Sequence, residues 1–550
     1  MRMIAARGFA AVLLLSGLSV AGAYGAGDQL SGVVADENHL ALQGVRVTIR
    51  SAGGEVTVRT DSQGRFTADV EGELISLKIA GEIIPAEEVR DRLSDLRIVV
   101  RKADISIHDS IVIRASALIP GIDRRDDAIY QNALFSRDDQ LFSTLDAGIN
   151  AGQHEGGGKS VEVRRFGFNL DHGGVSGGLK VLVDNVQQNH NSQGHGQGYL
   201  GQLKSLSPEL VEDVDILDGP FSPEYGDFSG LGVVHIRQKE RLPDHVTLRM
   251  QGGSFGFRRA FLAYSPRQDE SDSLLAWESS TTDGPFLNPL DYTRHNFTGN
   301  YTRRFGEERA LGLRLNAGTN RFNSSGQIPL DEVAAGRLDR FGLLDSQNGG
   351  RSRSATVGLY YRNGFQDDAS FKVDGFVSRS LLDLFANFTF FLNDLERGDG
   401  FQQHDSRLQE GANTQYLKPF RLLGRQSALT VGGNVHDNQI NVGLYPSVGR
   451  IPQGVTTRAD VRVSNVAGYV HEAIEASRSV QLGFGLRYDY FRFDVRDRVQ
   501  PATSGTAPIG RLQPKANLVL RPYASLPIKL FLNYGRGISS QDARGVIQRP

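Results

Sequence analysis

Apolar and polar residues alternate with a period of two through most of the second half of the chain. The clearest run spans residues 480–490, where every second position is apolar and the intervening positions carry glycine, amide or charged side chains. Comparable runs start near residues 246, 311, 429 and 528. Because successive side chains of a strand point to opposite faces, this pattern predicts a long series of half-buried strands from about residue 244 onwards.

The N-terminus has the pattern of an export signal. Arg2 and Arg7 precede the apolar run 9–15, and the small residues Ala21 and Ala23 follow it. This order is typical of a secretory signal peptide, which we predict over residues 1–25. A core helix or membrane anchor is disfavoured because the run is shorter than the ~20 residues of a helical span. No other run approaches that length, so a membrane crossing by this chain would use strands.

Residues 28–102 have the pattern of a small separate domain. Val45, Val47 and Ile49 alternate with polar residues, and Asp61 and Gly64 mark a tight turn. The spacing resembles the carboxypeptidase regulatory-like domain, which implies a β-sandwich, and Asp61 is interpreted as a turn residue rather than a calcium ligand. Residues 103–116 are predicted to be a linker. Its apolar patch either adds as a strand to a partner's sheet edge or begins the next domain's first strand.

Composition narrows the class of protein further. A chain of 550 residues is too long for one ordinary core. The 61 basic and 63 acidic residues give a net charge of −2, which provides no electrostatic footprint for nucleic acid. Glycine accounts for 64 of the 550 residues, which exceeds its usual share of about 7%. This excess favours an all-β chain. The absence of cysteine excludes disulfides, thiolate metal sites and a cysteine nucleophile.

Three motifs suggest chemistry but lack the structural context that the chemistry needs. Residues 174–178 match the letters of a serine nucleophile elbow, yet no helix is expected after them. Residues 156–160 end like a phosphate loop, but Gln153 stands where its first glycine should be. In a cluster of histidines, neither His190 nor His195 has a carboxylate or thiol at ligand spacing, which favours a polar loop facing a solvated cavity over contact with a ligand or metal. Its members are His154, His172, His190 and His195. We predict no catalytic residue, cofactor or metal site.

The segment from residue 161 to 239 resembles the plug domain of TonB-dependent outer-membrane receptors. The matching stretches are residues 161–169, 181–186, 211–226 and 230–239, and residues 465–472, 485–490 and 533–538 resemble barrel strands of the same family. The residues that carry the plug resemblance are Arg164, Asp184, Asp215, Gly219, Pro220, Tyr225 and Gly226.

The plug segment also departs from the family pattern. Arg165 and Asn185 stand where the family usually has glycine, and Asp218 replaces the usual arginine before Gly-Pro. Arg164 is a candidate partner for Asp215, with Asp218 as a second carboxylate nearby. The TonB box, the segment that the energising protein grips, is assigned by position only, to residues 109–115. The candidate residues are Asp109, Ser110, Ile111, Val112 and Ile113.

The resemblance implies an all-β, antiparallel membrane barrel over residues 241–550, an α+β plug over residues 117–240 and an N-terminal β-sandwich. Family barrels close with about 22 strands. The residues after the plug suffice for about 12–15 strands at roughly 20–25 residues each. We therefore expect an incomplete barrel and a C-terminally truncated sequence. Long polar loops, expected at residues 323–353 and 393–415, would lie on the outer side.

The function implied by the resemblance is energised uptake of a scarce ligand across the outer membrane. The partners would be the TonB protein, outer-membrane lipid and the ligand, which is a siderophore, haem, cobalamin, metal complex or oligosaccharide. Candidate ligand contacts on the plug are His190, Asn191, His195, Gln197 and Tyr199. Two alternatives remain: a passive porin or surface adhesin, and a secreted carbohydrate-processing enzyme with an accessory sandwich domain. The favoured interpretation is not an enzyme.

Overall fold

The structure is a computed structural model that describes part of the chain in detail. The described residues are 3–5, 11–14, 28–35, 45–61, 64–72, 74–79, 82–85, 96–100, 123–126, 149–153, 159–163, 178–195 and 200–548, without 267, 269, 307, 366–368, 478, 523–527. The chain divides into two compact units: residues 1–116 with 305–308, and the remainder.

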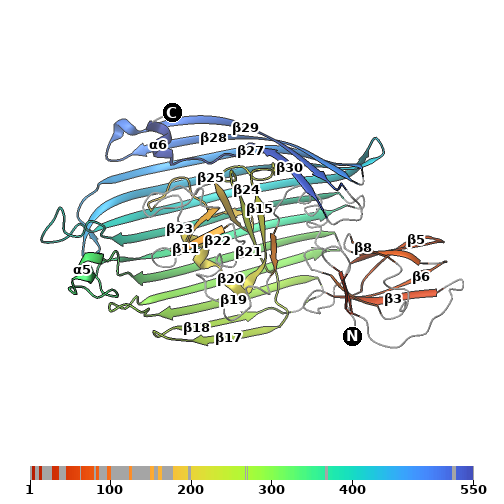
Figure 1. Ribbon diagram of the computed structural model, residues 1–550, viewed down its shortest axis with the longest axis horizontal. Coiled ribbons are helices and arrows are strands. Elements are labelled where there is room, and N and C mark those ends of the chain that lie inside the picture. The colour runs from red at the N-terminus through yellow and green to blue at the C-terminus, as the bar shows by residue number, and fades with distance from the viewer. Residues whose placement is uncertain are drawn as a thin grey trace. The chain divides into compact units, whose positions relative to one another are not determined.

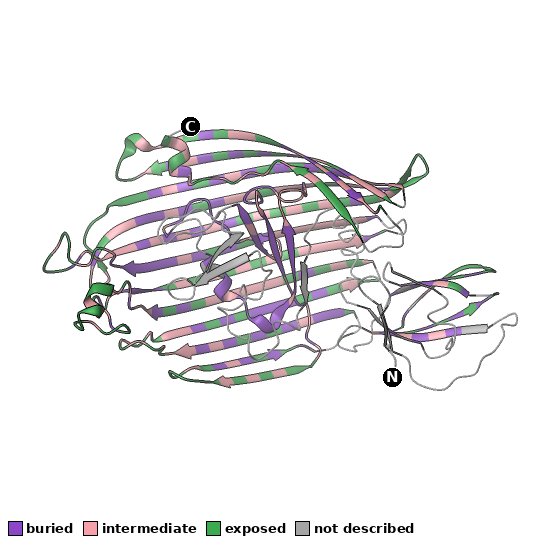
Figure 2. Ribbon diagram, in the orientation of Figure 1, coloured by how far each residue is buried: buried purple, intermediate pink, exposed green. Residues whose placement is uncertain are grey.

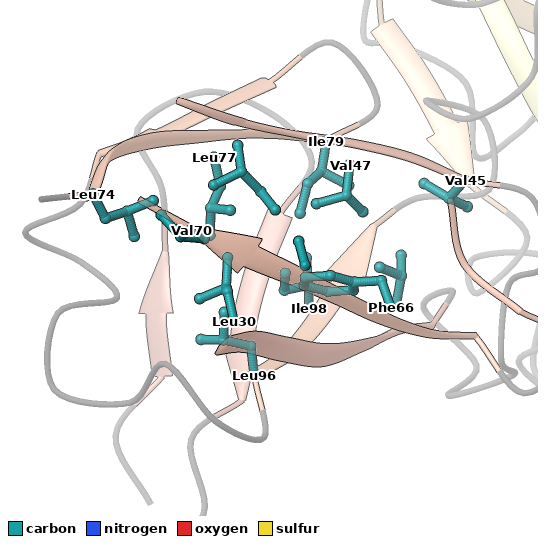
Figure 3. Close-up of a cluster of buried hydrophobic side chains, with 13 residues drawn as sticks. Leu30, Val45, Val47, Phe66, Val70, Leu74, Leu77, Ile79, Leu96 and Ile98 are labelled. Carbon is teal, nitrogen blue, oxygen red and sulfur yellow. The ribbon is translucent and has the colours of Figure 1, made fainter. Parts of the chain in front are cut away.

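The first unit consists of two sheets around one apolar core. One sheet has the order β1-β2-β9-β3-β6 and the other β5-β4-β7-β8. The strands are β1 (Met3–Ala5), β2 (Ala11–Leu14), β3 (Asp28–Ala35), β4 (Arg46–Ser51), β5 (Gly54–Arg59), β6 (Arg65–Val70), β7 (Leu74–Ile79), β8 (Glu82–Pro85) and β9 (Leu96–Val100). Val45, Val47 and Ile49 are buried with Phe66 and Leu77, as their alternation predicts (Figure 3).

Asp61 is a turn residue in this unit. Its Oδ1 accepts a hydrogen bond from the backbone N–H of Arg65 at 2.8 Å, which closes the turn that leads into β6. β1 and β2 lie within the residues for which we predict a signal peptide. The signal peptide and the resemblance to a regulatory-like domain both stay predictions.

The second unit contains the plug, whose main sheet has the order β10-β15-β16-β13-β14. Its elements are β10 (Asp123–Asp126), β13 (Leu179–Val183), β14 (Val186–Gln187), η4 (Gly201–Ser205), η5 (Pro208–Leu210), β15 (Val211–Asp218) and β16 (Gly232–Gln238), and β11 (Ile149–Gln153) pairs separately with β12 (Lys159–Val163). β13 runs parallel to β16, and β15 runs antiparallel to it. Leu179, Val214 and Val234 share a core with Leu203 and Leu206 of the η4 region.

A two-residue turn joins β13 to β14 and explains one departure from the family pattern. Asp184 and Asn185 have φ angles of 47° and 67°, and Val183 pairs with Val186 across the turn. Positive φ at both central residues is the geometry of a type I′ turn, which glycine, asparagine and aspartate tolerate best. Asn185 therefore adopts the backbone conformation for which the family usually provides glycine.

The second unit also contains an antiparallel sheet of fourteen strands within the described residues, from β17 to β30 (Figure 1). Neighbours in the sheet follow sequence order, except that the two-residue β26 pairs with β25 alone and β27 lies next to β25. The strands are β17 (Val246–Gly252), β18 (Arg258–Tyr264), β19 (Ser271–Thr282), β20 (Tyr292–Phe305), β21 (Arg309–Asn323), β22 (Gly349–Gly364), β23 (Ser370–Ala386), β24 (Phe401–Leu422), β25 (Arg425–Val448), β26 (Ile451–Pro452), β27 (Thr457–Ser477), β28 (Val480–Asp497), β29 (Gly505–Leu520) and β30 (Leu530–Gly535). Short helices are α5 (Leu330–Ala334), η6 (Pro501–Thr503) and α6 (Ala543–Gln548). The strand count lies within the predicted range. Within the described residues, no helix has the length and apolar character needed to cross a membrane.

The two faces of this sheet differ as the alternation predicts (Figure 2). In β28, Phe484 and Tyr488 are about half exposed, while Arg487 and Asp489 on the opposite face are buried. Beyond residue 490 the alternation inverts: Arg492 and Arg496 are exposed, whereas Phe491 and its neighbours on the same face pack with α6. The outward face therefore changes from apolar to charged along the strand.

One predicted loop is shorter than expected. The connection between β21 and β22 covers residues 324–348, close to the prediction, but β24 begins at Phe401, so residues 401–415 are strand rather than loop. The prediction failed because this part of β24 is polar on both faces: Gln403 and Asp405 face the plug, and Ser406 lies on the opposite face. A strand without an apolar face leaves no alternation to detect.

Candidate functional site

The large antiparallel sheet β17–β30 is called the wall from here on. Ion pairs join the plug to one side of this wall. Arg259 of β18 donates from Nη1 and Nη2 to the two carboxylate oxygens of Glu209 in η5, at 2.8 and 2.7 Å, and from Nε to Glu278 of β19 at 2.6 Å. Arg294 of β20 also pairs with Glu278, and all four side chains are buried. Burial alone would raise the pKa of Glu209, but the hydrogen bonds and charge of Arg259 outweigh burial and hold that pKa below its usual value.

Further ion pairs continue along the same side. Asp184 pairs with Arg314 of β21, and Glu240 pairs with Arg362 of β22. Backbone and neutral groups add to them: Asn296 Nδ2 donates to the carbonyl of Lys204 at 2.9 Å. We call the plug's contact with β17–β22 the ion-paired side. Separating the plug from these strands would break the pairs that cross between the two, which are Glu209–Arg259, Asp184–Arg314 and Glu240–Arg362. The pairs of Glu278 with Arg259 and Arg294 lie within the wall.

A different arrangement holds the plug against β23–β28, a contact that we call the polar seam. Arg487 of β28 donates from Nε and Nη2 to Asp489 of the same strand, at 2.6 and 2.9 Å. Arg487 reaches the plug through Nη1, which donates to the backbone carbonyls of Pro223 and Glu224 at 3.3 and 2.9 Å. The ion pair therefore lies within the wall, and the plug contributes only backbone oxygens.

Gly226 allows this close approach. A Cβ at this position would lie 2.5 Å from both Nε and Nη2 of Arg487, which is closer than real contacts permit. Arg487 cannot easily move aside because Asp489 holds its guanidinium through two hydrogen bonds in a buried site. The structure thus gives a packing reason for the Tyr225-Gly226 pair that the sequence resemblance singled out.

The polar seam encloses a cavity of about 80 Å³. Its plug side includes Lys180, Asn185, Gln187 and Glu224, and its wall side includes Lys372, Asp374, Asn413, Gln415, Asn434, His436, Tyr469 and Arg487. Asn185 Nδ2 donates across the seam to Asp374 Oδ1 at 3.0 Å. A polar cavity of this size has room for several water molecules.

Lys180 lies at the plug edge of the cavity. Its Nζ donates to Gln187 Oε1 at 3.0 Å and to the carbonyl of Asp227 at 3.1 Å. Burial, followed by the positive charge of Arg487, lowers the pKa of Lys180 to about 8, while Asp227 and Asp489 act in the opposite direction. The carboxylate of Asp227 also accepts hydrogen bonds from the backbone N–H and hydroxyl of Ser540, at 2.7 and 2.5 Å.

The described part of the predicted ligand loop is buried against β24 rather than facing a solvated cavity. His190, Asn191 and His195 are all nearly inaccessible. The ring Nδ1 of His195 lies 2.5 Å from Gln403 Oε1, and the backbone N–H of Gly194 donates to Asp405 Oδ2 at 3.2 Å. Burial lowers the pKa of His190 well below its usual value, so this ring is neutral at neutral pH. Gln197 and Tyr199 lie outside the described residues.

The plug residues singled out by the resemblance have varied places. Asp184 and Gly226 contact the wall, as described above, and Gly219 adopts a φ of 72° in the turn after β15. Asp215 forms an ion pair with Arg237 of β16, from Nη2 to Oδ2 at 2.6 Å. Arg164 and the candidate TonB box at 109–113 lie outside the described residues, so the expected Arg164–Asp215 pair stays a prediction.

Sequence reasoning missed several residues of the site. Arg237 follows from strand pairing, since it lies opposite Asp213 in the β15–β16 register. Glu209, Arg259 and Glu278 carried no local signal, because they are separated by 50 and 19 positions along the chain. Among the described residues, no three histidine, aspartate or glutamate side chains are placed to hold a metal ion.

Two family models match the chain. The model described as TonB dependent receptor-like, beta-barrel matches residues 251–548, and the TonB-dependent receptor plug domain matches residues 135–233. A sequence comparison with curated proteins gave no match.

Solved structures share the fold at low sequence identity. The unliganded ferric citrate transporter FecA is 14% identical with a TM-score of 0.63, and the match covers 77% of this chain and 64% of that protein. The alcaligin outer-membrane receptor FauA from Bordetella pertussis is 13% identical with a TM-score of 0.57, covering 77% and 63%. The copper transporter OprC is 12% identical with a TM-score of 0.57, covering 76% and 65%.

The chain thus spans less than two thirds of the length of each of these proteins. At such low identity, the structural matches establish the fold alone. The family models are more specific, because they match most of the wall and the plug as separate, consecutive units. The chain therefore belongs to the family of TonB-dependent receptors, transport receptors that form β-barrels in the outer membrane.

Proposed function

We propose that the protein is an outer-membrane receptor that takes up a scarce ligand, using energy delivered by the TonB protein. The observation that carries this proposal is the nature of the plug's contact with the wall. The plug has its own apolar core, and it meets the wall through buried ion pairs and hydrogen bonds and through one apolar cluster in which Leu210 packs with Phe261 and Leu274. Polar contacts can be exchanged for water, so a pulling force can shift such a plug without exposing its apolar core.

The ligand that we propose is small and rich in hydrogen-bonding groups. Amide and charged side chains of both signs line the cavity at the polar seam, which suits a polar solute better than an apolar one. Solved structures with this fold are named as a ferric citrate transporter, an alcaligin receptor and a copper transporter. A siderophore or another metal complex is therefore our first choice, ahead of haem, cobalamin or an oligosaccharide. His190, Asn191, His195, Gln197 and Tyr199 remain proposed contacts of the plug with this ligand.

The proposed route of energy is the linker before the plug. A signal peptide at residues 1–25 would export the protein across the inner membrane. The three segments that follow would then lie on the inner side of the outer membrane or in the lumen; they are the sandwich at 28–102, the linker at 103–116 and the plug at 117–240. TonB would then grip residues 109–115 as an added strand. Outer-membrane lipid would contact the exposed apolar face of the wall, which includes Phe484 and Leu486.

Deletion of residues 109–115 tests this function directly. Cells that carry the deletion should insert the protein at the parent level but lose growth on ferric citrate, ferric siderophores or copper complexes, whichever the parent supports. A shuffled linker of the same composition is the control for length. Uptake that persists in the deletion variant, or in cells without TonB, would indicate a passive porin instead. A soluble protein recovered without detergent would support the secreted-enzyme alternative.

A further inference from the structure

The two plug contacts differ in which bonds an opening motion must break. On the ion-paired side, Glu209 belongs to the plug, and Arg249 and Arg259 to the wall. Separation would leave the buried Glu209 without a charged partner, while Arg259 would keep only Glu278. At the polar seam, the pair Arg487–Asp489 belongs entirely to the wall. Separation there would remove two backbone carbonyls from Arg487 and leave the ion pair intact.

A second wall pair follows the same rule. Arg407 and Asp405 of β24 are hydrogen-bonded to each other at 3.0 Å. The plug meets them through the carbonyl of Ser192 and the backbone N–H of Gly194. In both places the charges of the wall satisfy each other, and the plug presents backbone groups that water can replace.

The plug's own fold also makes the seam the weaker side. β14 is the edge strand of the plug sheet, and the hairpin β13–β14 faces the seam through Asn185. The ion-paired side, by contrast, includes η4 and η5, and Leu203 of η4 and the adjacent Leu206 belong to the plug core. The edge strand β14 and the turn before it can move while β13 stays paired with β16, whereas moving η4 would disturb that core.

We propose that ligand passes along the polar seam, which opens between the plug and β23–β28 while the ion-paired side stays closed as a hinge. The inference rests on the proposed transport function. The cavity at the seam is the starting point of this passage, and its amide and charged side chains would replace the hydration of a polar ligand. The pair Asp184–Arg314 lies next to Asn185 and marks the border between the hinge and the seam.

Two single-cysteine variants can report the opening, because the chain contains no cysteine. Asn413→Cys places a thiol on the wall of the seam, and Asn296→Cys places one on the wall of the ion-paired side. Both replace a lumen-facing asparagine, so each is a matched control for the other. A membrane-impermeant maleimide would be applied to cells with and without a protonophore, which removes the energy that TonB uses.

The expected result is energy-dependent labelling at position 413 that is roughly fivefold faster than in protonophore-treated cells, with less than about a twofold change at position 296. Faster labelling at 296, or an equal increase at both positions, would overturn the seam as the passage while leaving TonB-driven transport standing. No energy dependence at either position would contradict the proposed function itself. In that case, urea titration of the purified full-length protein tests the seam separately. The cysteine at position 413 must react with the maleimide at lower urea than the cysteine at position 296, and the reverse order would overturn the seam.

Discussion

The two contacts between plug and wall differ in where their charged partners lie. On the ion-paired side, ion pairs cross from the plug to the wall. At the polar seam, the ion pair of Arg487 lies within the wall, and the plug meets it through backbone carbonyls. Removing one partner from a buried pair costs about 3–5 kcal/mol, because an uncompensated charge is left behind. A hydrogen bond between a charged group and a neutral partner, such as those of Arg487 with the plug carbonyls, contributes about 1.5–3 kcal/mol net, since water replaces the lost partner. The location of the charged partners, rather than their number, therefore decides which side of the plug can separate.

The largest expected effect comes from breaking a crossing pair. Glu209→Gln would leave Arg259 and Arg249 facing a neutral side chain, and should lower the free energy of detaching the ion-paired side by about 3–5 kcal/mol. The measurement is the urea midpoint of maleimide labelling at Asn296→Cys. Glu332→Gln, which removes the exposed pair with Arg337 in the outer connection, is the control and should leave the midpoint unchanged. If the parent, Glu209→Gln and Glu332→Gln had equal midpoints, the ion pairs of Glu209 would not hold the ion-paired side closed.

A smaller effect is expected from crowding the seam. Gly226→Ala would place a methyl group against the guanidinium of Arg487, and overpacking of this kind costs about 1–3 kcal/mol. Labelling at Asn413→Cys should then begin at lower urea, while labelling at Asn296→Cys stays the same. Gly230→Ala is the matched control, because a Cβ there meets nothing within 4 Å. If Gly226→Ala and Gly230→Ala began labelling at position 413 at the same urea concentration, the close approach of Gly226 to Arg487 would be disproved.

The smallest effect concerns pH. The pKa of Lys180 falls from 10.5 to about 8 in the folded protein. Below pH 8, Lys180 is therefore protonated in both the folded and the unfolded protein, and the cost of burying its charge lowers the free energy of unfolding in full. Between about pH 8 and 10.5 the unfolded chain binds more protons, and stability rises with pH. Lys180→Met should therefore be more stable than the parent at pH 7, by about 1–3 kcal/mol. The advantage should disappear near pH 10.5.

Urea unfolding of the plug at pH 7 and pH 10 measures this difference. Lys529→Met, at an exposed position next to β30, controls for the loss of a lysine. An advantage of Lys180→Met that stays constant with pH would show that buried charge at Lys180 is not the cause.

Much of the fold follows from local patterns in the sequence. The alternation in residues 480–490 predicts both the strand and the faces of its side chains, because one face is buried under the plug and the other is exposed. The plug strands and the Tyr225-Gly226 pair were also recognisable. The start of β24 was not, since residues 401–415 are polar on both faces and carry no alternation.

The difference between the two plug contacts could not be predicted from the sequence. Arg259 and Arg487 are both lumen-facing arginines on strands, and nothing in the neighbours of Arg259 reveals that it pairs with Glu209 of the plug. Asp489 lies two positions from Arg487, a spacing that places both on one face, whereas Glu209 lies 50 positions from Arg259. Long-range pairing of this kind depends on the docked fold.

The most direct test of the account ties each contact shut in turn and measures conductance through a planar lipid bilayer. Pro223→Cys/Gly485→Cys tethers the seam, where a Cβ at 485 would lie 3.3 Å from that of Pro223. Ser205→Cys/Gly318→Cys tethers the ion-paired side, where the corresponding distance is 2.7 Å and must widen by about 1 Å to reach disulfide spacing. As urea rises, the protein tethered at the ion-paired side should conduct like the parent, and the protein tethered at the seam should stay closed until a reductant cuts its disulfide. The opposite order, with the seam tether harmless and the other tether blocking, would contradict the account.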